Sequence, residues 1–154
     1  MTPEQRSRCM SRIRGSNTAV EVRFRCLLWR AGLRYALGRR LPGRPDLTFV
    51  AARVAVFVDG CFWHACPAHG VAPKANAEFW RAKIGRNAAR DVEVNRLLRA
   101  EGWTVLRVWE HEIELNAERC ARRTAAAIRR SAANVQRATA ARSPRHRTTP
   151  HRAR

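Results

Sequence analysis

Acidic residues are scarce in this sequence, and long apolar runs are missing. Only 12 of the 154 residues are Asp or Glu, against 31 Lys or Arg, so the formal net charge is +19 at pH 7. No apolar run approaches the roughly 20 residues of a membrane-spanning helix, and the first 17 residues, MTPEQRSRCMSRIRGSN, lack the hydrophobic core of a secretory signal. These absences argue against a membrane protein and predict an intracellular one.

The positive charge is spread over the whole chain. Residues 121–154 contain ten Arg and no Asp or Glu, and the first 120 residues still hold 21 basic against 12 acidic side chains, a net +9. A surface of this charge attracts polyanions, so we expect nucleic acid to be the partner of the main body. An anionic membrane surface is the weaker alternative, and a basic tail without function is the third.

The order of elements follows from turn residues and hydrophobic spacing. We expect a helix from Thr18, a good N-cap, to Gly32, strands over 46–50 and 53–60, helical segments over 76–87 and 89–102, a strand over 104–111 and a helix over 116–131. The order predicts an α/β fold, a small mixed sheet flanked by helices. We divide the chain into a basic N-terminal arm (residues 1–17), a folded domain (18–131) and a disordered Arg-rich tail (132–154).

A cluster of metal-ligating residue types follows the second predicted strand. Four of them fall within nine residues: Cys61, His64, Cys66 and His69. Thiolate and imidazole are the ligands that Zn²⁺ prefers, and an intracellular chain with five cysteines favours metal ligands or free thiols over disulfides. A short loop supplies three ligands more easily than four, and His111, after the third strand, is available as another. The spacing leaves open which histidine is not a ligand, and small core cysteines with surface histidines are the alternative.

Carboxylates at strand ends indicate a second, hard-cation site. Asp46 stands before the first strand and Asp59 ends the second, while Glu21 lies on the first helix. Such acids can converge to hold Mg²⁺ together with water and phosphate. The alternatives are a turn residue for Asp46 and a capping box from Thr18 for Glu21.

Asp91 and several aromatic residues also have two readings. Asp91 shares a helix face with Val94 and Leu98, so it needs a partner, which is a histidine, a hydrated metal or an arginine. Phe62 and Trp63 beside the Cys/His cluster, and Phe79 with Trp80, are candidates for stacking on bases, with ordinary packing as the alternative. Three further tryptophans are assigned to the core: Trp29, Trp103 and Trp109.

Four motifs together resemble the very short patch repair endonucleases, which are bacterial DNA mismatch endonucleases. They are LPGRPDL, VFVDGCFWH, NAEFWRAKIGRN and GWTVLRVWEHE, and the resemblance covers about residues 5–130 in order. It implies a divergent restriction-endonuclease-like fold with a structural zinc site. It also implies a Mg²⁺-dependent nick in one strand of double-stranded DNA, 5′ of the thymine in a T:G mismatch that arises from deaminated 5-methylcytosine. The expected setting is the bacterial cytoplasm and nucleoid, with mismatch-repair proteins as candidate partners. The sequence does not give the oligomeric state, and a monomer is the default expectation.

The resemblance also implies roles for single residues. Asp46 and the backbone carbonyl of Val58 would bind Mg²⁺, His64 would be the general base, and Glu21 and Asp91 would surround the metal and the base. Asp59 stands where the family has a histidine, which leaves it a metal or water ligand. The zinc ligands would be Cys61, Cys66, His69 and His111. Cys66 stands for a histidine of the family and His111 for a cysteine, a swap that keeps four N/S ligands. The residues that would intercalate beside the mismatch are Phe62, Trp63 and Trp80.

Two other functions remain compatible with these residues. One is a general restriction-type nuclease of the same fold, which would cut matched or branched DNA. The other is a zinc-stabilised DNA-binding module without cleavage.

Overall fold

A three-stranded mixed sheet is the centre of the protein. The computed structural model describes residues 18–70 and 76–142. The strands are β1 (Leu47–Phe49), β2 (Val54–Asp59) and β3 (Thr104–Trp109), in the order β1-β2-β3. β1 is antiparallel to β2, and β2 is parallel to β3 with Val54 opposite Thr104 and Asp59 opposite Trp109. The predicted small mixed sheet is confirmed, while its relation to the restriction-endonuclease fold stays a prediction.

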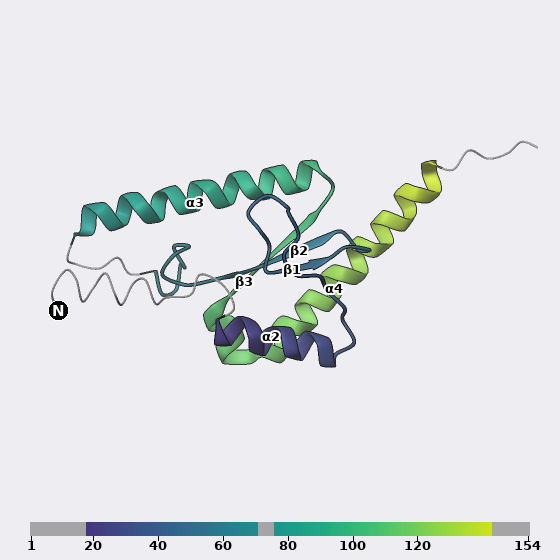
Figure 1. Ribbon diagram of the computed structural model, residues 1–154, viewed down its shortest axis with the longest axis horizontal. Coiled ribbons are helices and arrows are strands. Elements are labelled where there is room, and N and C mark those ends of the chain that lie inside the picture. Colours follow the sequence, from purple (N-terminus) through teal and green to yellow (C-terminus); the bar gives the residue numbers. More distant parts are fainter. Residues whose placement is uncertain (1–17, 71–75, 143–154) are drawn as a thin grey trace, which may run out of the picture.

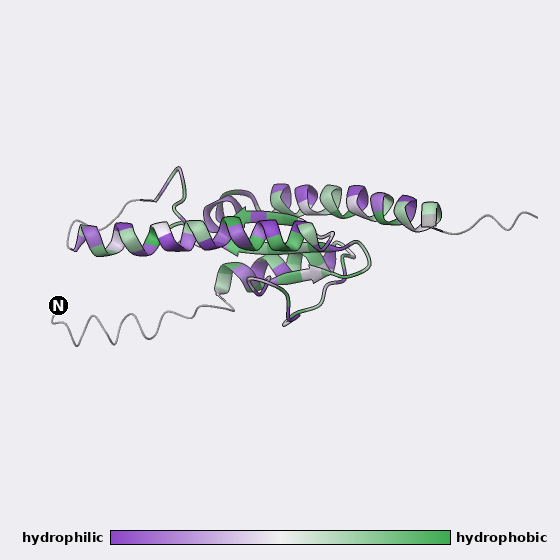
Figure 2. Cartoon of the chain, turned by 90° about the horizontal axis from the view of Figure 1, so that it is seen from above, coloured by the Kyte–Doolittle hydropathy of each residue, from purple (hydrophilic) through white to green (hydrophobic). Residues whose placement is uncertain are grey.

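Helices cover both faces of the sheet (Figure 1). Helix α2 (Ala19–Arg30) and helix α4 (Glu110–Arg142) pack together on one face, and helix α3 (Ala77–Ala100) covers the other. Figure 2 shows the strands mostly in the green of apolar residues, whereas hydrophilic and hydrophobic residues alternate along the helices. Among the described residues, no helix has both the length and the apolar character that a membrane span requires.

Burial on both faces explains the continuous apolar run of β2. Val54 and Val56 contact the α2–α4 side, and Ala55 and Phe57 contact the α3 side. A strand covered on both faces needs apolar residues at every position rather than at alternate ones. The polar side chain of Asp59 at the end of this strand, only 3% exposed, is therefore an exception that needs partners.

Helix α2 begins and ends where the sequence predicts. The hydroxyl of Thr18 accepts the backbone N–H of Glu21 at 3.2 Å, and the chain leaves the helix at Gly32 with φ of +81°. Phe24 and Leu28 are fully buried against the sheet. Trp29, in contrast, is not a core residue as predicted: it is half exposed, and the guanidinium of Arg34 lies over its ring.

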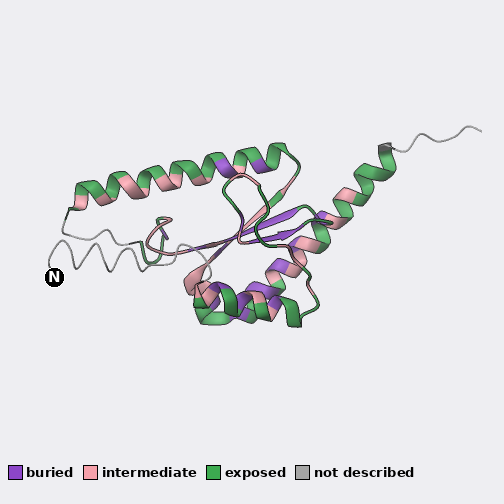
Figure 3. Cartoon of the chain, in the orientation of Figure 1, coloured by how far each residue is buried: buried purple, intermediate pink, exposed green. Residues whose placement is uncertain are grey.

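The loop of residues 60–70, which carries Cys61, Cys66 and His69, is called the metal-ligand loop, and the region after it forms one helix, not the two predicted segments. Helix α3 runs unbroken for 24 residues through Gly85. Glycine lowers helix propensity by about 1 kcal/mol but keeps its N–H, so the backbone hydrogen bonds continue. Only Val94 and Leu98 of this helix are buried, both in its C-terminal half (Figure 3).

The last helix is longer than predicted at both ends. Its main part starts near the expected position, because Asn116 has non-helical angles and its side chain caps the N–H of Arg119 at 2.8 Å. It continues to Arg142, so the expected disorder is wrong for residues 132–142. Alanine and arginine are strong helix formers, and Ile128 and Ala132 still pack on the core. The expectations for 1–17 and 143–154 lie outside the described residues.

Candidate active site and metal centre

A pocket of about 190 Å³ opens at the end of β2 where the strand meets the metal-ligand loop. All five residues predicted to be catalytic line it: Glu21, Asp46, Asp59, His64 and Asp91. They come from α2, the entry to β1, the end of β2, the loop and α3, so the sheet gathers segments that are up to 70 residues apart.

Asp46 is anchored to the backbone of β2. Its Oδ2 accepts the N–H of Val58 at 2.7 Å. Burial raises the pKa of Asp46 to about 6, and the nearby negative charges of Glu21 and Asp59 add to the rise. The hydrogen bond from Val58 and the charge of Arg25 oppose it. An acid whose ionisation is disfavoured in this way gains from a cation beside it.

The turn that carries Asp46 is fixed by close packing. Gly43 has φ of +73°, and a Cβ there would lie 2.5 Å from Cγ1 of Val94 on α3. The next residue, Arg44, also has a positive φ, 53°, which is strained for a side chain other than glycine. Its guanidinium is exposed at the pocket mouth and makes no ion pair among the described residues.

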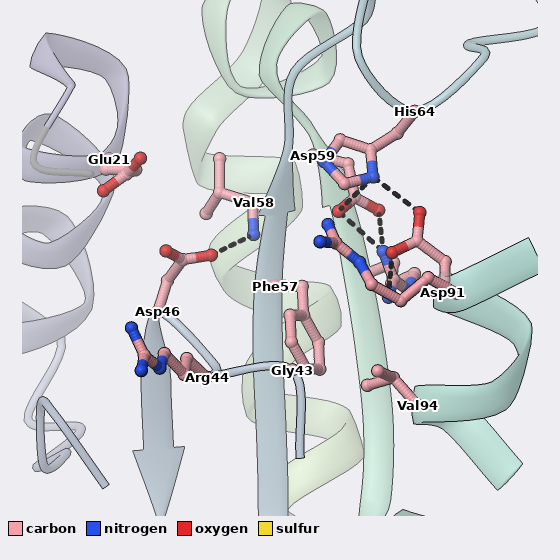
Figure 4. A pocket seen from close by; sticks show the side chains of 12 residues that line it. Glu21, Gly43, Arg44, Asp46, Phe57, Val58, Asp59, His64, Asp91 and Val94 are labelled. Carbon is pink, nitrogen blue, oxygen red and sulfur yellow. Dashed lines mark hydrogen bonds and ion pairs between the residues drawn. The ribbon is translucent and has the colours of Figure 1, made fainter. Parts of the chain in front are cut away.

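Glu21 faces Asp46 from the first turn of α2 (Figure 4). The carboxylate is buried and binds Arg25 at 2.8 Å, one helical turn on. The hydroxyl of Thr18 also accepts the backbone N–H of Glu21. Glu21 therefore takes part in the N-terminal cap of α2 and lines the pocket at the same time.

His64 is held by carboxylates on the other side of β2. Its Nδ1 lies 2.6 Å from Oδ2 of Asp91 and 3.8 Å from Oδ1 of Asp59. A carboxylate only accepts, so we assign the proton to Nδ1, which leaves Nε2 able to accept a proton from a ligand.

Arg107 on β3 was not predicted to belong to the site. Its guanidinium binds both oxygens of Asp59, at 2.8 and 2.9 Å, and Oδ1 of Asp91, at 3.1 Å. It also lies 4.7 Å from the ring centre of Phe57. The sequence feature that could have pointed to Arg107 is a single arginine within the mostly apolar strand TVLRVW. An arginine in such a strand implies an acidic partner in the protein interior.

The pocket therefore has two sides, separated by β2 (Figure 4). Glu21 and Asp46 lie on the α2 side, and His64 and Asp91 lie on the α3 side. Asp59 belongs to the α3 side, with its carboxylate turned to Arg107 rather than to Asp46.

The predicted metal-ligand set comes together in space. The ligand atoms of four residues all lie within 4.8 Å of one another: Cys61, Cys66, His69 and His111. Nδ1 of His111 is 3.0 Å from Sγ of Cys61 and 3.6 Å from Sγ of Cys66. Neighbouring ligands of a tetrahedral zinc ion are about 3.5 Å apart, so this donor set fits Zn²⁺. His64 is outside this cluster, which supports it as the histidine that is not a ligand, and that assignment stays a prediction.

The loop between β2 and α3 also carries an aromatic cluster. The ring centres of Phe62 and Trp63 are 4.9 Å apart, and that of Trp80 on α3 lies 5.1 and 6.0 Å from them. Lys83 lies over the rings of Trp63 and Trp80. The three rings are partly exposed and belong to neither hydrophobic core cluster of the described residues.

Comparison with known proteins identifies relatives that match two thirds or more of the chain. Residues 1–69 match the family described as DNA mismatch endonuclease Vsr. The chain is 42% identical over 132 residues to the type II nicking enzyme V.NmeDIP of Neisseria meningitidis serogroup C, covering 84% of this chain and 89% of the relative. It is 48% identical over 113 residues to the type II nicking enzyme V.NaeI of Lentzea aerocolonigenes, covering 70% and 68%.

A further relative carries the family description in its own name. The chain is 42% identical over 108 residues to the DNA mismatch endonuclease Vsr of Escherichia coli K12, covering 68% of this chain and 69% of the relative. The matches extend over more than two thirds of each of these relatives. The chain therefore belongs to the DNA mismatch endonuclease Vsr family.

Proposed function

We propose that this protein is a DNA endonuclease that nicks one strand of a duplex on the 5′ side of the thymine in a T:G mismatch, and so starts very short patch repair. Its membership of a mismatch endonuclease family and the names of its relatives, which are nicking enzymes, support the endonuclease activity. The mismatch preference rests on the site itself.

The observation that carries the proposal is that one loop contributes residues both to the acidic pocket and to the aromatic cluster. Residues 60–66 contribute His64 to the acidic pocket and Phe62 with Trp63 to the aromatic cluster. The amide of Asn87 on α3 holds this loop through the carbonyl of Trp63 at 3.0 Å. A base step opened by the aromatic rings would therefore present its phosphate at a defined position relative to His64.

A mismatch makes this opening less costly. A T:G pair stacks and pairs less well than a matched pair, so wedging apolar rings beside it costs less free energy. The rings that would enter are Phe62, Trp63 and Trp80. The net charge of +19 would supply affinity for the phosphate backbone without sequence preference.

The two sides of the pocket suit the two requirements of phosphodiester hydrolysis. Asp46 and the carbonyl of Val58, with Glu21 nearby, would hold a Mg²⁺ ion, which when bound would polarise the scissile phosphate and stabilise its developing charge. On the other side, Nε2 of His64 would accept the proton of the attacking water while Asp91 holds Nδ1. Arg44 at the pocket mouth would contact the phosphate.

Zinc would have a structural role. A tetrahedral ion on Cys61, Cys66, His69 and His111 would tie the loop to the start of α4, and it would fix Phe62, Trp63 and His64 between its ligands. No open ligand position is left for chemistry in a four-residue set.

The test is a nicking assay with Mg²⁺ on end-labelled duplexes that differ only by T:G in place of C:G, within randomised flanking sequence. We expect one nick 5′ of the mismatched thymine and no cutting of the matched duplex. Equal cutting of both duplexes would favour a general nuclease, and binding without any cutting would favour a DNA-binding module. The flanks of the cut molecules would report the sequence context.

A further inference from the structure

Arg107 is the most completely bound charged side chain in the pocket. Its Nη1 binds both carboxylate oxygens of Asp59, its Nη2 binds Asp91, and its Nε donates to Oδ1 of Asn95 at 3.2 Å. Every nitrogen of the guanidinium thus has an acceptor inside the protein. Arg44, in contrast, has an exposed guanidinium, so only one of these two arginines is available to a substrate phosphate.

Asp59 is bound just as completely. The carboxylate is 3% exposed, and both oxygens are engaged by the same Nη1. A metal ligand on this carboxylate would have to break the pair, which would leave Arg107 partly buried without its main counter-ion. Breaking a buried ion pair by removing one partner costs several kcal/mol, so this arrangement resists recruitment of Asp59 by a cation.

The sheet register explains why these groups meet. Arg107 lies opposite Phe57 on β2, two residues before Asp59, and stacks over that ring. Asp91 lies one turn before Val94 on the helix face that packs on the sheet. The hydrophobic layer of Phe57, Val94 and Leu98 therefore continues directly into the charged network.

We propose that Arg107 is a positioning residue: it uses Asp59 as its counter-ion and holds Asp91 where Asp91 accepts the Nδ1–H of His64, so that Asp59 is not a ligand of the catalytic metal. The proposal rests on the proposed nuclease function and deepens it. Removal of Arg107 would leave Asp59 and Asp91 as two like charges on either side of His64, and Asp91 would lose one of its two partners.

The first experiment is a double-mutant cycle on single-turnover nicking of the T:G duplex at saturating enzyme. It uses Arg107→Met, Asp59→Asn and the two changes combined. We expect Arg107→Met to lower the rate constant by about 10- to 100-fold, in the range found for orienting partners of active-site groups. Its affinity for the duplex should change by less than about threefold, because the guanidinium contacts no substrate.

The combined variant makes the test independent of folding problems. It removes both charges of the Arg107–Asp59 pair together, so neither is left buried without the other. If Asp59 serves only Arg107, adding Asp59→Asn to Arg107→Met costs no further activity, and the cycle is strongly non-additive. Losses that multiply, or an Arg107→Met variant with wild-type rate, would overturn the proposal. Arg96→Met is the matched control, because Arg96 on α3 is exposed and its ion pair among the described residues is with Glu93 on the same helix; this variant should nick normally.

A second readout needs no cleavage. Mn²⁺ binding to the protein bound to a duplex with a non-cleavable linkage is followed by the electron paramagnetic resonance of the free ion. Asp46→Asn should weaken Mn²⁺ binding at least tenfold, and Asp59→Asn should leave it within about threefold of wild type. Equal weakening by both changes would show that Asp59 is a ligand and would overturn the proposal.

The two proposals fail in different ways. If the wild-type protein cuts matched and mismatched duplexes alike, the mismatch function fails, and the cycle is run on the matched duplex. If it cuts neither, the nuclease function fails, and the Mn²⁺ measurement alone decides on Asp59. Normal mismatch nicking with an additive cycle rejects only the role of Arg107.

Discussion

The two sides of β2 balance their charges differently. On the α3 side, Asp59 and Asp91 both pair with Arg107, and Asp91 also accepts the Nδ1–H of His64. On the α2 side, Asp46 makes no side-chain ion pair among the described residues, and burial raises its pKa to about 6. The difference separates two roles: a partly buried acid without an ion pair favours a cation beside it, and a paired network fixes the orientation of a proton acceptor.

The largest expected effect comes from removing the unmatched charge. Asp46→Asn should lower nicking by about 10³-fold, since it removes a metal ligand worth several kcal/mol. The amide oxygen still accepts the N–H of Val58, so the fold has no reason to change. Unchanged nicking would show that the metal lies elsewhere.

The same variant tests the raised pKa through stability. The folded protein holds a proton on Asp46 up to about pH 6, whereas the unfolded chain loses it near pH 4. Without metal, the stability of the wild type therefore falls as the pH rises between about 4 and 6, by up to about 3 kcal/mol. Urea unfolding should show Asp46→Asn to be more stable than the wild type at pH 7.5, and no more stable at pH 4.

On the α3 side of β2, His64→Ala should reduce nicking by about 10²-fold or more while the protein keeps one zinc per chain. His111→Ala should lose the zinc as well as the activity, because it removes one of four ligands. Metal analysis of the two purified variants separates the roles. Loss of zinc in His64→Ala would show that His64 is a zinc ligand and would contradict its assignment as the general base.

A substitution of Arg44, which lies beside Asp46, should reduce nicking by a smaller factor. Arg44→Asn should lower nicking by about tenfold, the loss of one phosphate contact, and should leave thermal stability equal or higher, because asparagine tolerates a positive φ. Arg53→Asn is the matched control. Arg53 has the same backbone strain, but its side chain lies over Trp103 far from the pocket, so this change should reduce stability and spare nicking.

The smallest effect is expected from the four arginines that follow residue 142. A chain that ends at Arg142 keeps all of α4 and loses four arginines. Its nicking rate at saturating enzyme should equal that of the full chain. The plot of log affinity against log salt should flatten by up to about 3.6 units if all four contact phosphates. An identical salt dependence would show that these arginines do not touch DNA.

Local signals predicted most of the elements. Thr18 and Gly32 bound α2, and the apolar run from Val54 to Val58 becomes β2. The errors lie where local signals are weak. Gly85 did not break α3, and the alanine-rich segment after Ser131 is helical because its propensity is high and Ile128 and Ala132 pack on the core.

The sequence by itself determined the chemical composition of the site: the acids at strand ends, and four metal-ligand candidates within one loop. Only the tertiary structure decided which of them meet. The pairing of β2 with β3 brings His111 to Cys61 and Arg107 to Asp59, and the packing of α3 brings Asp91 to His64. These partners are 27 to 50 residues apart. Local spacing constrains only neighbours along the chain, so contacts over such distances follow from sheet register and helix packing.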